Sequence, residues 1–243
     1  MTTFVLVHGG GHGGWCWQPL VKQLRSSGHE VYAPTLTGLA DRQHLLHPGI
    51  NLDTHIQDIC SLLQFEDLTD VVLVGHSYGG MVITGVADLS LERVSGLVYL
   101  DAAIPHSGES LLDVSPGLNN FKDIREVHGV RLGLWPDANI IRLYGITDPA
   151  QIDWVLPKLT PHPWATFEQK LQLNHPDEVK RVKRAIMNCT LSLRNRPDQT
   201  ASRWLSGDLI KELDAGHDLM LVEPKITAQF LYDFIKVING EII

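Results

Sequence analysis

The chain has 243 residues, of which 44% are hydrophobic, and a formal net charge of −8. This length and composition predict one sizeable globular domain with room for an insertion. The negative charge argues against nucleic acid and anionic membranes as partners, and no apolar run approaches the ~20 residues of a membrane span. Because the N-terminus lacks a signal-peptide pattern and begins with a strand-like run at residues 4–7, we predict a cytoplasmic protein.

Apolar runs and helical patterns alternate along the first hundred residues. Strands are expected at residues 2–7, 30–33, 71–74 and 94–100, and helices at residues 19–26, 54–63 and 80–87. Asp53 or Thr54 is the expected cap of the second helix. Strands without polar alternation, separated by helices, predict a parallel sheet that helices cover on both faces.

The local amino-acid composition changes between about residues 105 and 184, where prolines occur at seven positions from 116 to 176 and aromatic residues are frequent. This stretch predicts short helical pieces and no convincing strand. Sheet-like texture resumes near 185–193 and 209–213, and an amphipathic helix at 226–238 closes the chain. We therefore predict a core of residues 1–104 and 185–243, with residues 105–184 as a helical cap inserted over the strand ends.

The pentapeptide Gly75-His76-Ser77-Tyr78-Gly79 lies between a predicted strand and a predicted helix. Although G-x-S-x-G also arises by chance, this order is the context in which it forms a nucleophile elbow. Small flanking residues are needed because the turn holds its central residue in a strained backbone conformation. The Ser77 hydroxyl would then stand above the sheet, and the backbone N–H of Tyr78 would face an anion formed beside it.

Five motifs occur in one order along the chain: Leu6–Gly10 with Gly13–Trp17, Ala33–Gly38, Val74–Gly80, Leu97–Ala102 and Gly216–Met220. Together they resemble the α/β-hydrolase superfamily across nearly the whole chain. The likeness is greatest to small capped esterases related to plant methylesterases and hydroxynitrile lyases, and to bacterial esterases of pyrethroid and carbamate type. The resemblance implies an α/β-hydrolase fold, with a mostly parallel sheet flanked by helices and a helical cap, and no cofactor or metal.

Ser77 is the expected nucleophile and His217 the expected base, because His217 lies in a Gly-His turn after the final strand and fits the Ser, acid, His order of this fold. This chemistry requires the two side chains to meet. By family likeness Gly10 supplies the second oxyanion N–H beside that of Tyr78. His8 and His12 are expected to brace the loop that holds Gly10.

The acid of the triad is less clear from the sequence. Most relatives place it after the strand that follows the cap, but residues 188–195 hold no carboxylate, and Ser192 stands where one is expected. Asp101, at the end of the strand after the nucleophile helix, is the favoured acid, and Asp198 is the alternative. Asp214 lies too close to His217 in sequence to orient it. Without an acid, Ser192 or a carbonyl could fix the tautomer of His217.

Other sequence patterns suggest rival functions. Gly9–Gly14 spells G-x-G-x-x-G, but the second strand ends without the acid that a dinucleotide site requires. His8 and His12 have the spacing of a metal pair but lack the H-E-x-x-H context.

Three alternatives to hydrolysis stay open. A hydroxynitrile lyase of this family would carry lysine at position 218 and threonine at position 9, where this chain has Asp218 and Gly9. A cofactor-free dioxygenase on the same fold would use His217 and Asp101 to deprotonate an aromatic hydroxyl. A non-catalytic ligand-binding receptor would keep the pocket without turnover.

Aromatic residues of the cap are expected to line the substrate pocket, chiefly Trp135, Trp154 and Trp164, with Phe121, Tyr144 and Phe167 as further candidates. An aromatic roof suits a bulky apolar ester or carbamate. We therefore predict a carboxylic ester hydrolase that acts on small molecules, as a monomer or a homodimer, without nucleic-acid or membrane partners.

Overall fold

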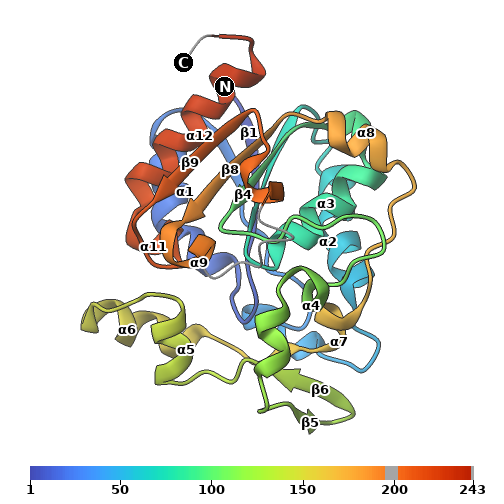
Figure 1. Ribbon diagram of the computed structural model, residues 1–243, viewed down its shortest axis with the longest axis vertical. Coiled ribbons are helices and arrows are strands. Elements are labelled where there is room, and N and C mark those ends of the chain that lie inside the picture. The colour runs from blue at the N-terminus through green and yellow to red at the C-terminus, as the bar shows by residue number, and fades with distance from the viewer. Residues whose placement is uncertain (195–201, 242–243) are drawn as a thin grey trace.

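A six-stranded sheet forms the centre of the molecule, described by a computed structural model for residues 1–194 and 202–241 (Figure 1). The strands are β1 (Thr3–Val7), β2 (Glu30–Tyr32), β3 (Val71–His76), β4 (Val94–Leu100), β8 (Arg184–Cys189) and β9 (Leu209–Leu213). Their order is β2-β1-β3-β4-β8-β9, and every neighbouring pair is parallel. The prediction of an α/β fold with a parallel sheet is confirmed.

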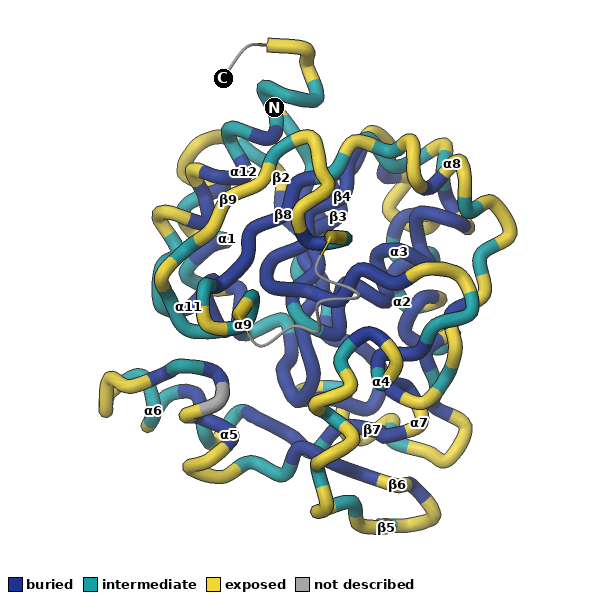
Figure 2. Tube along the Cα trace, in the orientation of Figure 1, coloured by how far each residue is buried: buried dark blue, intermediate teal, exposed yellow. Residues whose placement is uncertain are grey.

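Helices cover both faces of this sheet. They are α1 (Gln18–Ser26), α2 (Leu52–Phe65), α3 (Gly79–Leu89), α8 (Pro176–Arg181), α9 (Thr190–Arg194), α11 (Leu219–Val222) and α12 (Pro224–Ile238). In Figure 1, α1, α11 and α12 pack together on one side of the sheet, and α2, α3 and α8 on the other. The central strands are therefore buried along most of their length (Figure 2), which is why their sequences are apolar without alternation.

Residues 101–183 connect β4 to β8. The part of this insertion at residues 111–168 lies at the lower end of the sheet in Figure 1, whereas α8 packs against α3 on one face of the sheet. The lower part contains helices α4 (Leu111–Val114), α5 (Ala138–Leu143), α6 (Pro149–Val155) and α7 (Ala165–Glu168), and strands β5 (Arg125–Val127), β6 (Val130–Gly133) and β7 (His162–Pro163). The three strands form an antiparallel sheet.

The expectation of an insertion without strands is therefore wrong. Strands β5 and β6 make a hairpin in which Val127 pairs with Val130 across a loop of only two residues. His128 and Gly129 in that loop have φ angles of 51° and 77°, as a type I′ turn requires. The two strands were missed because they are short and mix charged with apolar side chains.

Two element ends also differ from the sequence-based expectation. Helix α2 begins earlier than predicted, because Asn51 is the cap: its side chain accepts a hydrogen bond from the N–H of Thr54, whose hydroxyl accepts one from the N–H of Asn51. Strand β8 ends at Cys189 rather than near residue 193, and α9 follows directly. Among the described residues, no helix is both long and apolar enough to cross a bilayer.

Candidate active site

The turn between β3 and α3 holds Ser77 at a φ angle of 53°, in the left-handed region. A side chain at Gly79 would overlap the carbonyl oxygen of Val7, and one at Gly80 would overlap that of Ala103. Glycine is required at these positions because backbone from β1 and from the β4 loop fills the space. The expected order of strand, sharp turn and helix is present in the structure.

Asp101 and His217 form the central polar contact of the site. One carboxylate oxygen of Asp101, Oδ2, lies 2.6 Å from Nδ1 of His217. The same oxygen accepts a hydrogen bond of 2.6 Å from the Ser192 hydroxyl, and Oδ1 accepts one from the N–H of Cys189. Asp101 is 3% exposed and has a φ angle of 44°. A buried carboxylate held by three donors is fixed in orientation, and it keeps the proton of His217 on Nδ1.

The turns that carry Ser77 and Asp101 are bonded to each other. The N–H of Ser77 donates to the Leu100 carbonyl, and the Ser77 carbonyl accepts from the N–H of Ala103 at 2.9 Å. This adjacency follows from the sheet order, since β3 and β4 are neighbours and both turns lie at their carboxyl ends.

His217 lies in the loop between β9 and α11, and His76 holds that loop in place. The Nε2–H of His76 donates to the His217 carbonyl at 3.0 Å, and the two imidazole rings lie 4.6 Å apart. Burial, followed by the neighbouring His217 ring, lowers the pKa of His76 to about 3, so this ring stays neutral. His76 therefore packs as expected and also anchors the backbone of His217.

Two further histidines brace the glycine-rich loop after β1. His8 is fully buried; its Nδ1–H donates to the Gly9 carbonyl, and its Nε2 accepts from the N–H of Leu36. Burial lowers the pKa of His8 to about 3. His12 contacts the Gly10 carbonyl through Nδ1 and Asp218 through Nε2. These contacts occupy both nitrogens of each ring, so the two side chains do not present a metal pair.

Asp218 is buried beneath this loop and does not line the cavity described below. Its Oδ2 lies 3.0 Å from Nε2 of His12, and its N–H donates to the Tyr144 carbonyl. Burial alone would raise the pKa of Asp218, but His12, with His76 and His217, outweighs burial and the pKa lies below its usual value. Position 218, where the hydroxynitrile-lyase alternative would require lysine, thus holds a buried carboxylate that does not line the cavity.

Gly10 and Tyr78 each present a backbone N–H near Ser77. Among the described residues neither N–H donates to a protein acceptor, and both residues line the same cavity as Ser77. The Gly10 carbonyl accepts from the Tyr144 hydroxyl as well as from His12. These two bonds fix the backbone of the loop at Gly10. Two free donors beside a serine can stabilise an oxyanion.

The candidate residues converge on a cavity of about 400 Å³. Its lining comprises Gly10, Ser77, Tyr78, Asp101, Ala102, Ala103, Leu111, Val114, Ser115, Pro116, Gly117, Leu118, Phe121, Leu134, Tyr144, Phe167, Ser192, Trp204 and His217. Apart from Asp101 and His217, these residues carry no ionisable group other than the Tyr78 and Tyr144 phenols, whose pKa values burial raises. The cavity suits a neutral, mainly apolar molecule with one polar reacting group.

Comparison with known proteins identifies the fold family. The sequence pattern of the α/β hydrolase family matches residues 4–230. The chain belongs to the α/β hydrolase family. It is 42% identical to the carbendazim hydrolyzing esterase of Nocardioides sp. (strain SG-4G), over 95% of this chain and 98% of that protein.

Solved structures of α/β hydrolases agree in fold. An extracellular α/β-hydrolase from Paenibacillus matches with a TM-score of 0.80 and 24% identity, covering 96% of this chain and 98% of that one. A methylesterase from Arabidopsis matches with a TM-score of 0.76 and 22% identity, covering 98% and 100%. These structures show the fold alone. The family match and the 42% identity to an esterase over most of the chain show that the protein is an enzyme of the carboxylic ester hydrolase class, as predicted.

The three tryptophans predicted to line the pocket of this α/β hydrolase do not line the cavity. Trp135 lies under the Arg125 guanidinium, and Trp154 packs edge-on against Trp15. Trp164 is buried and contacts Phe167 from behind. Each large ring is used in packing within the insertion or against the glycine-rich loop. Of the cap aromatics named from the sequence, Phe121, Tyr144 and Phe167 line the cavity.

Trp204 was not singled out from the sequence, yet it forms part of the cavity wall. Its indole N–H donates to the Ala102 carbonyl at 2.8 Å, and its ring is buried. The only sequence signal was a lone tryptophan in an otherwise polar stretch. Asp214 bonds to the Thr190 hydroxyl. The alternative acid, Asp198, lies outside the described residues.

Proposed function

We propose that this α/β hydrolase cleaves neutral esters and carbamates of bulky apolar or aromatic small molecules through an acyl-enzyme on Ser77. The observation that carries the proposal is the contact between Asp101 and Nδ1 of His217 in the cavity that Ser77 also lines. A serine hydroxyl is a poor nucleophile until a base takes its proton, and this pair supplies such a base.

The reaction follows from these positions. Nε2 of His217 takes the proton of Ser77 while Oγ attacks the substrate carbonyl, and Asp101 stabilises the imidazolium that forms. The N–H groups of Gly10 and Tyr78 donate to the oxyanion. His217 then returns the proton to the departing alcohol. A water molecule, deprotonated by His217, attacks the acyl group and releases Ser77.

The cavity lining supports apolar substrates without charge. Leu118, Phe121 and Leu134 present hydrocarbon surface, and among the described residues no lysine or arginine lines the cavity to attract an anion. Carbamates fit the same steps, since attack by Ser77 releases the alcohol and leaves a carbamoyl ester that water cleaves. The 42% identity to an esterase named for hydrolysing carbendazim supports including them.

The geometry offers less support for lyase chemistry. A cyanide leaving group needs a cation near the base, and the residue after His217 is a buried carboxylate paired with His12. Hydrolysis is therefore the preferred reaction.

The test compares Ser77→Ala and His217→Ala with the wild type on p-nitrophenyl acetate and a phenyl methylcarbamate. We expect kcat to fall by on the order of 10⁴ to 10⁶-fold in both variants. A fluorophosphonate should label Ser77 and leave Ser115, which lines the same cavity, unlabelled. Hydrolysis that persists in both variants would refute the mechanism.

A further inference from the structure

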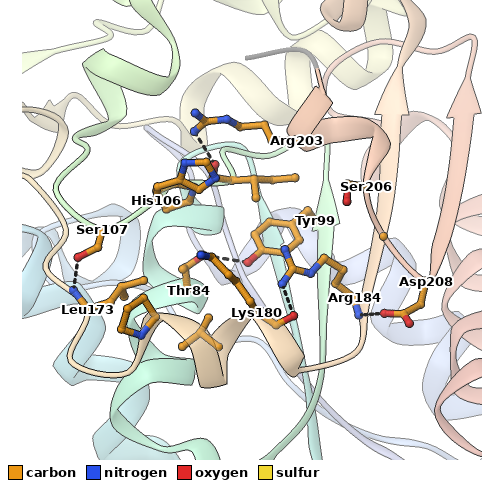
Figure 3. Close-up of a pocket in the computed structure, with 15 residues that line it drawn as sticks. Thr84, Tyr99, His106, Ser107, Leu173, Lys180, Arg184, Arg203, Ser206 and Asp208 are labelled. Carbon is orange, nitrogen blue, oxygen red and sulfur yellow. Dashed lines mark hydrogen bonds between the residues drawn. The ribbon is translucent and has the colours of Figure 1, made fainter. Parts of the chain in front are cut away.

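A second cavity, of about 720 Å³, lies beside the catalytic one and shares none of its lining residues (Figure 3). It is lined by Thr84, Tyr99, Ile104, Pro105, His106, Ser107, Leu173, Pro176, Val179, Lys180, Arg184, Arg203, Ser206, Gly207 and Asp208. Figure 3 shows His106, Lys180, Tyr99 and Arg184 gathered around the same opening. We propose that this cavity binds a small organic monoanion, a carboxylate attached to a compact apolar body.

Arg184 provides the anchor for the carboxylate. Its guanidinium donates one hydrogen bond, from Nη2 to the Lys180 carbonyl at 2.8 Å, and it pairs with no carboxylate among the described residues. The remaining N–H groups have the planar fork that matches the two oxygens of a carboxylate. Arg184 is half-buried at the start of β8, which limits the number of directions in which it can point.

The other charges around the cavity are mostly neutralised. Arg203 binds both carboxylate oxygens of Glu109, at 2.7 and 3.1 Å. Asp208 accepts hydrogen bonds from Lys183 and from the backbone N–H of Arg184.

Lys180 and His106 complete the electrostatics. Lys180 is exposed and lies 3.6 Å from Asp177, a weak surface pair. Burial, and then the nearby Arg203, lowers the pKa of His106, so its ring is uncharged at neutral pH. The half-buried Arg184 guanidinium is the stronger of the two cationic anchors, because the Lys180 ammonium is exposed and screened by water. The cavity therefore matches one negative charge better than two.

The rest of the lining is suited to the apolar body of the ligand. Ile104, Leu173 and Val179 present side chains from three segments, with Pro105, Pro176 and the Tyr99 ring beside them. The Ser107 oxygen accepts from the N–H of Leu173, so its O–H stays available as a donor. An anionic head on Arg184 and a hydrocarbon body against these residues would satisfy both parts of the cavity.

A short wall separates the two cavities. Arg203 lines the second cavity and donates to the Ile104 carbonyl, whereas the next residue, Trp204, lines the catalytic cavity and donates to the Ala102 carbonyl. A ligand in the second cavity therefore contacts different residues from a substrate in the catalytic cavity. Substitutions of Arg184 or Lys180 change the lining of the second cavity alone.

Isothermal titration with benzoate at pH 8 tests the proposal, with benzamide as the neutral isostere and inorganic phosphate, which is mostly the dianion at that pH, as the doubly charged ligand. We expect benzoate to bind, and Arg184→Met to weaken it by about tenfold, because the charge-assisted pair is lost while the hydrocarbon stem remains. Lys180→Met, an exposed change that leaves the core intact, should weaken binding about threefold. Arg181→Met is the matched control: it removes the same charge from an exposed position outside the cavity and should leave binding unchanged.

The opposite results would overturn the proposal. Benzoate that binds equally to the wild type and to both cavity variants must sit elsewhere, including in the catalytic cavity. The absence of benzoate binding at millimolar concentration, or equal binding of benzamide or phosphate, would also contradict it. Urea denaturation of each variant confirms that the comparison is made between folded proteins, and Lys180→Met decides the question if Arg184→Met does not fold.

Discussion

The carboxylate of Asp101 lies 2.6 Å from Nδ1 of His217, although the two residues are 116 positions apart in the sequence. Asp101 reaches this place from the end of β4, the strand next to the one that leads into Ser77. Ser192, which follows β8, donates to the same carboxylate oxygen. Ser192 thus occupies the position where the triad acid was expected, and it donates to Asp101, which comes from the neighbouring strand β4.

Asp101→Asn should lower kcat by up to about 10⁴-fold with little change in KM, because the amide no longer holds the proton of His217 on Nδ1 or stabilises the imidazolium. Steady-state kinetics on p-nitrophenyl acetate measure this. Asp214→Asn is the control, since Asp214 bonds to Thr190 and not to His217. Equal activity in both variants would rule out Asp101 as the acid.

Ser192→Ala should lower kcat by about tenfold, because a hydrogen bond to a charged group contributes roughly 1.5–3 kcal/mol, of which only part is felt in the transition state. Ser192→Thr, which keeps the hydroxyl, should recover most of the activity. Ser115→Ala provides a comparison at a serine that lines the same cavity without touching Asp101. If the threonine variant is as slow as the alanine variant, the hydroxyl is not what matters.

Asp218→Asn should destabilise the fold by about 3–5 kcal/mol, because it breaks a fully buried pair with His12 by removing one charge. Urea denaturation at pH 7 gives the free energy of unfolding. Asp177→Asn removes an exposed carboxylate and should change it by less than about 0.5 kcal/mol. A small loss in Asp218→Asn would mean that the pair contributes little to stability.

Acid should unfold the protein through its buried histidines. Burial lowers the pKa of His8 and His76 to about 3 and that of His55 to about 4, below the ordinary value of 6.5. Between pH 6.5 and 3 the unfolded chain therefore binds more protons than the folded one. The stability these residues contribute is full above pH 6.5 and is lost as the pH falls, by up to about 1.4 kcal/mol per unit for each histidine.

Urea denaturation at pH 7, 6 and 5 measures this loss. His76→Phe should flatten the profile, because one buried imidazole is gone. His175→Asn, at an exposed position, should leave the slope as it is in the wild type. A wild-type profile that stays level down to pH 5 would contradict the assignment of neutral histidines.

Phe121→Ala should reduce kcat/KM for aryl carbamates by about 5–30-fold while affecting p-nitrophenyl acetate less, because the ring lines the cavity and contacts only large substrates. Trp135→Ala is the matched control, since Trp135 lies in the insertion outside the cavity. Competition between an aryl carbamate and p-nitrophenyl acetate would reveal the change in substrate selectivity. A greater effect of Trp135 than of Phe121 would show that the cavity lining was wrongly assigned.

Local sequence signals predicted the sheet, the turn at Ser77 and the place of His217, because each depends on a few consecutive residues. Asp101 was the favoured acid from the sequence, but its contact with His217 needed the structure, since it depends on whether the end of β4 lies beside the loop after β9. The hairpin at His128 and Gly129 was missed because its strands are short and mix charged with apolar side chains.

Contacts across the chain could not be inferred from the sequence. The backbones of Gly145 and Gly216 pack against each other and join the insertion to the loop of His217. Nothing in the sequence around either glycine indicates this contact. The use of Trp164 in packing and of Trp204 in the cavity wall was equally hidden, because side-chain size does not tell which neighbours surround a ring.

The backbone bonds that join the turn of Ser77 to the loop after β4, and the bond from His76 to the His217 carbonyl, have a consequence for heating. Ser77 and Asp101 follow the neighbouring inner strands β3 and β4, and His217 is bonded to β3 through His76. The three residues therefore stay together while those strands stay paired. Thermal inactivation should therefore coincide with cooperative melting of the whole sheet and should not precede it.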